Sequence, residues 1–455
     1  MTMTISRIAR LKLALALGAG LVAVSGSAAF AAKPEAAPAA PKMTNSKEFA
    51  TAAGPLQKTL TAARPAIDKY LNAPADQKSA AMTELKAAFA GADTQLAAAE
   101  AAIKTPGDRY LAGQWGMQVG SILGNSTIHA HAIQNVLDSG LAPADKVATY
   151  QVELGAAYYE AKDYPNAIKI LTPAVAANAS DDAAAELLAQ SYASQGQPQQ
   201  GLAALKTAVA ARKAAGGAVP ESWYARAAQI SYNAKPRLAA EGMDWAIGLA
   251  EVNASPKNWF EAAQLVRDYG GFGAKDALDI SRVMYRTGAF KAQLDAGTVR
   301  REYLEYIQDA DPRAQAGEVI KVAEAGIAAG VLKPTDTFVA DALGQARPRV
   351  AADKASLPGS ARAAAAAANG ISALATGDAY LGYGDAANAE AMYKLAVQKG
   401  GIDTGRATLR MGIAQADQGH YADAKASFAK VTDTRAPIAR LWSVYVDQKQ
   451  AGKIS

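Results

Sequence analysis

The sequence contains no cysteine and only three histidines, and these two absences exclude several kinds of functional site. Without cysteine there is no disulfide framework, no thiolate metal site and no site for lipoprotein acylation. A serine or cysteine nucleophile with an imidazole base would need one of His129, His131 and His420. On a helix, His129 and His131 would point about 200° apart, and they could share a metal only in an extended segment. We expect neither a metal site nor a cofactor.

Long hydrophobic runs are also missing. The apolar run at residues 13–24 follows a basic start and is shorter than the roughly 20 apolar residues that a membrane-spanning helix needs. Ala29-Phe30-Ala31 then supplies an A-x-A cleavage site. We therefore predict a bacterial secretory signal peptide over residues 1–31, cleaved after Ala31. This predicts a mature chain without an integral membrane segment, located in the periplasm or exported.

A strong excess of one charge is absent from the predicted mature chain. Removing Arg7, Arg10 and Lys12 from the 47 basic residues leaves 44, against 42 acidic residues. Because no basic tail or patch stands out, we expect no nucleic-acid partner.

Aromatic residues are scarce, at 7% of the chain, while alanine is abundant. This composition suits closely packed helices and predicts an all-α protein. A chain of 455 residues exceeds a single compact core, which indicates several domains or one extended repeat array.

The first part of the mature chain divides into a spacer and a helical module. Residues 32–46 are rich in proline and alanine, with little to bury, and are predicted to form a disordered spacer. Residues 47–105 show the periodicity of an amphipathic helix and are expected to form two or three helices. With an atypical helix pair at residues 109–140, they complete a predicted N-terminal helical module over residues 47–140.

A pattern of large and small residues at 148–181 recurs at 182–215. In the first copy, positions 7, 8, 11, 20, 24 and 27 are Leu154, Gly155, Tyr158, Ala167, Leu171 and Ala174. The same size classes return in the second copy at Leu188, Ala189, Tyr192, Gly201, Leu205 and Ala208. Two antiparallel helices cross closely only where small residues meet, and large residues fill the space beside the crossing. This spacing resembles the tetratricopeptide repeat.

Further copies are less regular. Two begin at Pro220 and Pro256, with Trp223 and Trp259 at position 4, and the second has an insertion before a helix that carries Ala277. Near the C-terminus the pattern returns at Gly377, Tyr380, Ala389, Tyr393 and Ala396, and then at Gly412, Ala424 and Phe428. Residues 302–332 indicate another helix pair, and residues 335–368 an alanine-rich helix.

The resemblance implies a right-handed superhelical solenoid of helix pairs with a concave inner wall. We expect repeats resembling the tetratricopeptide repeat at residues 141–290 and 370–446, with degenerate helical repeats at 291–369 between them and a tail at 447–455. In this family the first helix of each pair lines the concave wall. We expect a ligand to contact those wall residues that are aromatic, amide or arginine side chains, namely Tyr159, Gln190, Tyr224, Tyr232, Phe260, Gln264 and Arg267.

Two functions fit this wall. Aromatic residues with amide and arginine neighbours suit a peptide, and the first hypothesis is a non-enzymatic periplasmic scaffold or adaptor that binds another envelope protein. The second is a solenoid that handles an exported polysaccharide, which would need exposed aromatic faces in a row. The Lys/Asn clamp that chaperone-binding repeats use for a C-terminal carboxylate is missing. The same aromatic residues could instead pack between adjacent repeats.

No arrangement of residues predicts catalysis. The glycine-rich segments 270–275 and 382–386 are expected in turns and match no phosphate-binding or dinucleotide-binding motif. Paired carboxylates are expected at helix starts or on exposed faces, where they complement the helix dipole, at Asp181 and Asp182 and at Glu302 and Glu305. We therefore expect no enzyme.

Overall fold

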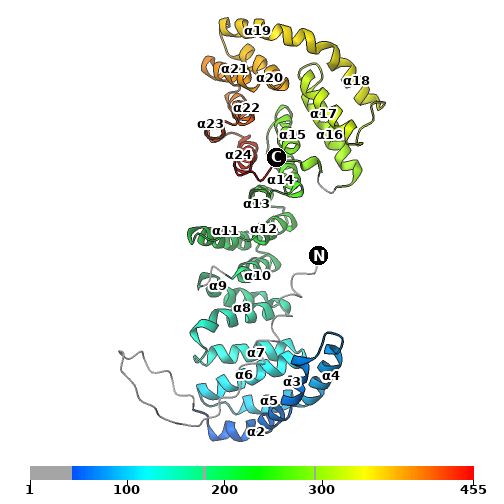
Figure 1. Ribbon diagram of the computed structural model, residues 1–455. Helices are drawn as coiled ribbons and strands as arrows, with labels where there is room; N and C mark the ends of the chain where they lie inside the picture. The colour runs from blue at the N-terminus through cyan, green and yellow to red at the C-terminus, as the bar shows by residue number, and fades with distance from the viewer. Residues whose placement is uncertain (1–43, 178–180, 292–293, 455) are drawn as a thin grey trace, which may run out of the picture. The chain divides into compact units, whose positions relative to one another are not determined.

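The computed structural model describes residues 44–177, 181–291 and 294–454, and all regular secondary structure in these ranges is helical (Figure 1). The predicted all-α fold of packed helix pairs is confirmed. The predicted signal peptide and residues 32–43 of the predicted spacer lie outside the described residues. Among the described helices, none is both long enough and apolar enough to span a membrane.

The chain divides into two compact units, residues 1–218 and residues 219–455. The division falls inside the block predicted at 141–290. The first unit contains, in order, α2 (Lys47–Ala62), α3 (Arg64–Asn72), α4 (Lys78–Ala88), α5 (Ala92–Ala101), α6 (Pro106–Leu123), α7 (Ser126–Asp138), α8 (Ala144–Glu160), α9 (Tyr164–Ala177), α10 (Asp182–Ser194) and α11 (Pro198–Ala214).

Residues 47–101 of the first unit form four helices, α2 to α5, where the sequence analysis expected two or three. Helix α2 ends at Ala62, and Pro65 lies in the first turn of α3, where its missing N–H group leaves no hydrogen bond unmade. Gly91 separates α4 from α5 with a φ of +77°, in the left-handed region that glycine adopts without strain. The apolar period runs through both breaks, which is why the sequence did not reveal them.

The first described residues are tied to the start of α6. Ser46 caps α2, and its backbone N–H and hydroxyl each donate to the carboxylate of Asp108, both at 2.8 Å. The backbone N–H groups of Lys104 and Thr105 donate to the same carboxylate. Burial raises the pKa of Asp108, but these four hydrogen bonds outweigh it and hold the pKa below its ordinary value. Residues 44–46, predicted as the end of a disordered spacer, therefore belong to the folded unit.

The repeated pattern of the first unit corresponds to the pairs α8–α9 and α10–α11. A Cβ atom on Gly155 at position 8 would overlap the side chain of Leu171 at position 24. In the next pair, a Cβ on Gly201 would lie 2.5 Å from the carbonyl oxygen of Ala189. Small residues therefore set the distance between paired helices, as the spacing predicted.

The second unit contains, in order, α12 (Glu221–Asn233), α13 (Ala239–Val252), α14 (Pro256–Tyr269), the 3₁₀ helix η1 (Ala274–Asp276), α15 (Ala277–Arg286), η2 (Ala289–Lys291), α16 (Ala296–Ala310), α17 (Ala316–Ala328), α18 (Thr337–Ala346), η3 (Arg347–Arg349), α19 (Val350–Ala366), α20 (Ile371–Gly382), α21 (Ala386–Lys399), α22 (Thr404–Asp417), α23 (Tyr421–Phe428) and α24 (Ala436–Gln450). The predicted pair at 302–332 corresponds to α16 and α17. Helix α24 extends into the predicted tail.

The C-terminal pairs repeat the packing of the first unit. A Cβ on Gly377 would lie 2.8 Å from the ring of Tyr393, and a Cβ on Gly412 would lie 2.5 Å from the ring of Phe428. Both contacts join position 8 to position 24, which are the positions of Gly155 and Leu171 in the first unit. The glycine contacts of the two units therefore follow one rule of helix crossing.

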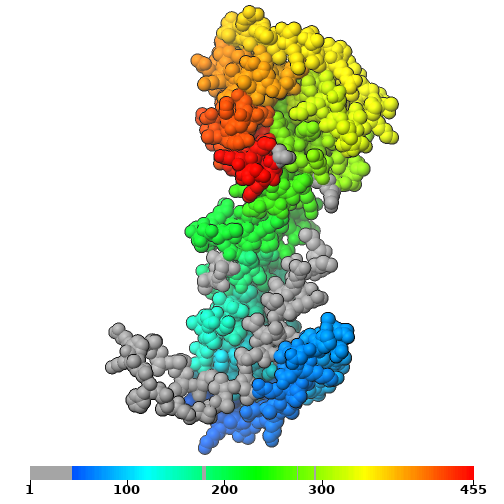
Figure 2. Space-filling view, viewed as in Figure 1, coloured from blue at the N-terminus to red at the C-terminus, as the bar shows by residue number. Residues whose placement is uncertain are grey.

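The last helix of the second unit packs back on its early helices. Helix α24 contacts α13, α14 and α15, and Figure 2 shows its red surface directly against green helices of the same unit. The indole N–H of Trp259 donates to Gln448 Oε1 at 2.9 Å, and Gln448 Nε2 donates to the carbonyl oxygen of Ala250 at 2.5 Å. The second unit is therefore closed by contacts between α24, its last helix, and the early helices α13, α14 and α15.

Helix α15 lies in the interior of the second unit. Every residue from Leu278 to Met284 is buried, including charged ones, because α14, α16 and α24 pack around this helix. It follows the predicted glycine-rich insertion, where Gly271 has a φ of +71°. The insertion thus carries the chain from α14 into the interior of the unit.

Candidate functional site

Two of the predicted ligand-binding residues belong to the first unit. Tyr159 on α8 is half-buried, and its ring centroid lies 5.6 Å from that of Tyr164. Gln190 on α10 is half-buried, and its amide lies 3.4 Å from the hydroxyl of Ser194. Both helices are first members of their pairs, as the repeat pattern predicted.

Two further predicted residues pack within the second unit. Tyr224 on α12 is only 5% exposed, and its ring makes a T-shaped contact with that of Trp245 on α13 at a centroid distance of 5.6 Å. Phe260 on α14 is partly buried against the main hydrophobic core. The ring of Tyr224 therefore offers almost no surface to a ligand.

The structure brings Gln264 and Arg267 together through one carboxylate. Gln264 Nε2 donates to Glu302 at 2.6 Å, and Arg267 Nη1 donates to Glu302 at 2.9 Å and to Glu305 at 2.7 Å. Glu302 is fully buried, so its expected place on an exposed face or at a helix start was wrong. The error arose because the sequence does not reveal that two side chains of α14 reach this turn of α16. Asp181, in contrast, caps α10 as expected, accepting the N–H groups of Ala183 and Ala184.

A third carboxyl group, that of Asp309, lies on α16 with those of Glu302 and Glu305. Burial raises the pKa of Asp309 on α16 to about 6, and the negative charges of Glu305 and Glu302 contribute to the increase. The guanidinium of Arg267 acts in the opposite direction and does not cancel the effect. Arg267 and Arg301, which lies 3.6 Å from Glu305 and 3.8 Å from Glu302, thus face three acidic side chains on α16.

Tyr232 has a different setting, because it is 59% exposed at the end of α12. The guanidinium carbon of Arg237, in the connection between α12 and α13, lies 3.9 Å from the centroid of the Tyr232 ring. Arg237 Nη1 also donates to the hydroxyl of Tyr269 at 2.5 Å, and Tyr269, at the end of α14, is 37% exposed. We call Tyr232, Arg237 and Tyr269 the Tyr–Arg–Tyr clamp.

The sequence analysis found one member of the clamp and missed two. Arg237 lies between the paired helices, outside the wall positions of the repeat, and Tyr269 lies at the end of a helix beside the glycine-rich insertion. The only signal was a basic, proline-containing turn, Lys235-Pro236-Arg237, directly after Tyr232 and Asn233. Neither the apolar periodicity of the helices nor the spacing of the repeats indicates that this turn meets the end of α14.

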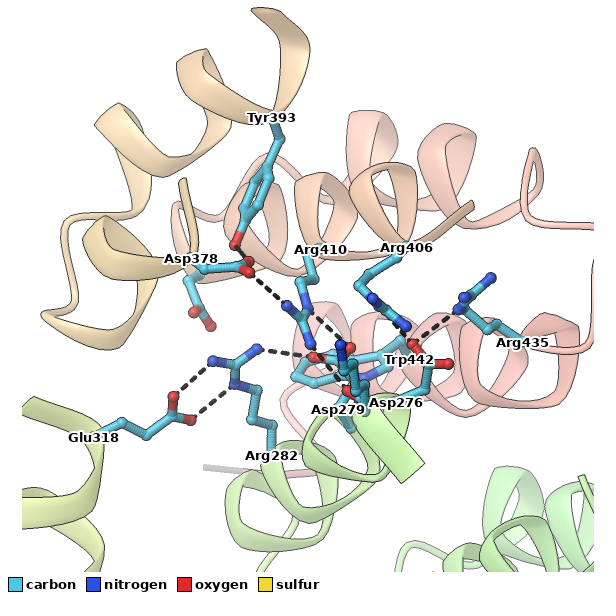
Figure 3. Close-up of polar contacts among 12 residues, drawn as sticks. Asp276, Asp279, Arg282, Glu318, Asp378, Tyr393, Arg406, Arg410, Arg435 and Trp442 are labelled. Atoms are coloured by element: carbon cyan, nitrogen blue, oxygen red, sulfur yellow. Dashed lines mark hydrogen bonds and ion pairs between the residues drawn. The ribbon is translucent and has the colours of Figure 1, made fainter. Parts of the chain in front are cut away.

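Ionisable residues of α15 form a buried network with three other helices (Figure 3). Arg282 donates to Asp279 at 2.8 Å and forms a two-pronged contact with Glu318 on α17, at 2.8 and 2.6 Å. Arg410 on α22 donates to Asp279 at 3.1 Å, and the indole N–H of Trp442 on α24 donates to the backbone carbonyl of Asp279. Asp279 therefore links α15 with both α22 and α24.

The charges of this network satisfy one another. Burial raises the pKa of Glu318, but Arg282 and the Tyr306 hydroxyl outweigh it and bring the pKa to about 2. Arg410 also donates to Asp378 on α20 at 2.7 Å, where the hydroxyl of Tyr393 donates as well. Because its acidic and basic groups are paired with one another, the network serves to hold the helices together.

A second group of ion pairs fixes the entry to α15. The carboxylate of Asp276 is almost fully buried and lies 2.8 Å from Arg406 Nε and 2.9 Å from Arg435 Nε. Burial raises the pKa of Asp276, but Arg406 and Arg435 lower it below its ordinary value. The insertion before α15 is thus tied to α22 and to the segment before α24.

The three histidines contact different parts of the chain. His129 Nδ1 lies 3.0 Å from the Ser121 hydroxyl on α6, whereas His131 Nδ1 lies 3.1 Å from Glu100 on α5. His420 precedes α23 and is more than half exposed. Within residues 44–177, 181–291 and 294–454, no group of three or more His, Cys, Asp or Glu residues is arranged to hold a metal ion.

Comparisons with known proteins add little to the geometry described above. No family model matches the chain, and no curated protein matches it. Among solved structures, the chain is similar to one titled "TPR2AB-domain:pHSP90-complex of yeast Sti1", with 14% sequence identity and a TM-score of 0.24. The match covers 67% of this chain and 97% of that chain. The account of the fold therefore rests on the helix pairs and glycine contacts of this chain itself.

Proposed function

We propose that this chain is a non-enzymatic helical scaffold or adaptor of the bacterial periplasm that binds another envelope protein or peptide. The observation that carries the proposal is the Tyr–Arg–Tyr clamp, in which two tyrosines and an arginine are exposed together on the second unit. Tyrosine and arginine are enriched among the residues that dominate protein–protein binding energy. Helix pairs suit such a role because they hold surface residues at regular distances.

The ion pairs of the second unit support a binding role over a catalytic one. Arg282, Glu318 and Asp279 are buried and engaged with one another, so they are not offered to a substrate. A fold alone does not define a task, so the proposal depends on the exposed clamp rather than on the likeness to a repeat family.

The polysaccharide alternative receives less support from the aromatic residues. Stacking on a sugar chain needs exposed aromatic faces in a row, but Tyr224 is buried, while Tyr159 and Phe260 are each only half-exposed. Tyr232 is exposed, but Arg237 covers one face of its ring. These side chains thus suit a protein surface better than a glycan.

The proposed location rests on the N-terminal sequence. A basic start, a short apolar run and an A-x-A site together are typical of secretory signal peptides. N-terminal sequencing of the protein from the periplasmic fraction is expected to give a mature chain that begins at Ala32. An uncleaved chain that starts at Met1 and is found in the cytoplasmic fraction would contradict this part of the proposal.

In-cell photo-crosslinking tests the binding role. A photo-crosslinking amino acid replaces Tyr232, and in a control strain it replaces Ile371, which is equally exposed at 59% but lies at the start of α20. We expect one dominant envelope protein to be captured at position 232 and not at position 371. Capture of glycan alone at position 232 would favour the polysaccharide alternative. Equal capture at the two positions, or none at either, would refute a protein-binding clamp.

A further inference from the structure

The clamp also indicates the chemistry of its partner. Building on the proposed function, we propose that the Tyr–Arg–Tyr clamp binds an acidic segment of the partner protein, with a side-chain carboxylate of that segment on Arg237. This site lies in the connection between α12 and α13 and at the ends of α12 and α14, and of its three residues only Tyr232 occupies a position that the repeat pattern assigned to ligand contact.

The guanidinium of Arg237 is held in place before any partner arrives. It lies 3.9 Å from the centroid of Tyr232 and 5.9 Å from that of Tyr269, and it donates a hydrogen bond to the Tyr269 hydroxyl. An arginine side chain has five N–H donors, so the two tyrosine hydroxyls beside it leave most of them available. The clamp therefore presents donors of fixed orientation at the surface.

The charge of Arg237 is not neutralised within its unit. No Asp or Glu carboxylate lies within 4.0 Å of Arg237 in the described part of the chain, although Arg282, Arg286 and Arg410 of the same unit each have at least one. Lys235, two residues earlier, is exposed and adds a second positive charge. A carboxylate is the group that matches a guanidinium in both charge and geometry, because it can accept two parallel hydrogen bonds.

The two tyrosines favour a peptide as the carrier of that carboxylate. Tyr232 and Tyr269 are 59% and 37% exposed, so apolar ring surface lies on both sides of the cation. A peptide can place a carboxylate on Arg237 and neighbouring side chains against these rings. Because the rings already restrict Arg237, binding costs less conformational entropy than it would with a free arginine.

Binding of defined peptides to the full processed chain tests the proposal. The probe is a fluorescein-labelled decapeptide of alternating glutamate and serine, and its counterpart has glutamine in place of each glutamate. We expect the glutamate peptide to bind at least about 10-fold more tightly at low salt, which is the usual gain from a charge-assisted hydrogen bond. Fluorescence anisotropy up to millimolar protein measures both affinities.

Substitutions assign the preference to the clamp. Arg237→Gln should reduce the preference to less than about twofold, while Arg237→Lys should keep part of it, since lysine retains the charge without the planar fork. The matched control is Arg362→Gln, which removes one positive charge from an exposed site on α19 of the same unit. Thermal unfolding of each variant verifies that its fold is unchanged.

Specific outcomes would overturn the proposal. These are equal binding of the two peptides to the unmodified chain, or an equal loss of preference in Arg237→Gln and Arg362→Gln. Arg237-dependent binding of tetragalacturonate without binding of the glutamate peptide would assign the clamp to an acidic polysaccharide instead. If the crosslinked partner at position 232 is attached through a segment without acidic residues, the scaffold proposal stands and the carboxylate proposal fails. If no protein is captured, the scaffold proposal itself fails.

Discussion

One buried amide, that of Gln448, bonds α24 to α13 and α14, and Gln448→Met tests how much it contributes to the closure of the second unit. Gln448 is 3% exposed, accepts a hydrogen bond from the indole N–H of Trp259 and donates one to the carbonyl oxygen of Ala250. Methionine is also unbranched and of similar length, but its thioether donates no hydrogen bond and accepts only weakly. The substitution therefore removes these two hydrogen bonds, and a longer one at 3.3 Å from Gln448 Nε2 to the carbonyl oxygen of Glu251, while it changes the packing little.

The loss of stability follows mainly from two buried groups that lose their hydrogen bonds to Gln448, the indole N–H of Trp259 and the carbonyl of Ala250. Trp259 and Ala250 are both fully buried, so neither group can turn to water when Gln448 is replaced. A buried donor or acceptor without a partner costs about 1–3 kcal/mol, which gives a loss of about 2–4 kcal/mol for the pair after partial relaxation. This is a large part of the roughly 5–15 kcal/mol that stabilises a typical domain.

Denaturant unfolding and hydrogen exchange measure the effect. We expect Gln448→Met to lower the unfolding free energy by this amount and to accelerate amide exchange in α24, α13 and α14. The control is Gln450→Met, two residues later on the same helix but exposed, which should change stability by less than about 0.5 kcal/mol. If the two variants are equally stable, or if exchange in α24 is unaffected by Gln448→Met, the argument that this amide closes the unit is refuted.

Three further predictions concern packing and pH. Gly201→Ala should destabilise the protein by about 1–3 kcal/mol in thermal unfolding, because the new Cβ would meet a backbone oxygen. The control is Gly54→Ala inside α2, where the new Cβ would meet no atom, and it should stabilise the protein by about 0.5–1 kcal/mol. A loss of stability in both variants would contradict the rule that small residues set the helix crossing. The pKa of Glu318 falls on folding from 4.5 to about 2, so its stabilising contribution is present above pH 4.5 and is lost as the pH falls through 2. Glu318→Gln should therefore destabilise by about 3–5 kcal/mol at pH 7 and by less near pH 2, as measured in urea; a penalty that does not change with pH would refute this assignment. The pKa of Asp309 instead rises on folding from 3.8 to about 6, so the stability of the wild-type protein should decrease as the pH rises from 4 to 6. Urea titrations should show that Asp309→Asn is more stable than the wild-type protein at pH 7 but not at pH 4.

The sequence predicted contacts between neighbouring helices well. Gly155 and Leu171 lie on consecutive helices, and the short turn between α8 and α9 brings them together without help from the rest of the chain. Residue size at the helix crossing is therefore a local property that spacing can reveal. Helix starts such as that at Asp181 are also local, since the capping side chain bonds to the next turn. The same reasoning misjudged the breaks near Pro65 and Gly91, where the apolar period continues across the break.

The candidate site was predicted only in part, for a related reason. Tyr232 was found from its position in the repeat, but Arg237 approaches it from a turn whose path no period describes. Glu302 was misplaced because it meets side chains of α14, and one of these, Arg267, lies 35 residues before it. Side chains that meet across different helix pairs depend on how each pair is rotated on the next, and the repeat spacing does not specify that rotation.

The sequence by itself determined the all-α fold and the close crossing of paired helices, because both depend on residue periodicity and size within a few turns of the chain. Only the tertiary structure decided that α24 returns to α13–α15 and that α15 lies in the interior of the second unit. The contact between Trp259 and Gln448 spans 189 residues, so its formation depends on how every helix pair between them packs on the next. That packing involves whole helices, and no short segment of the sequence specifies it.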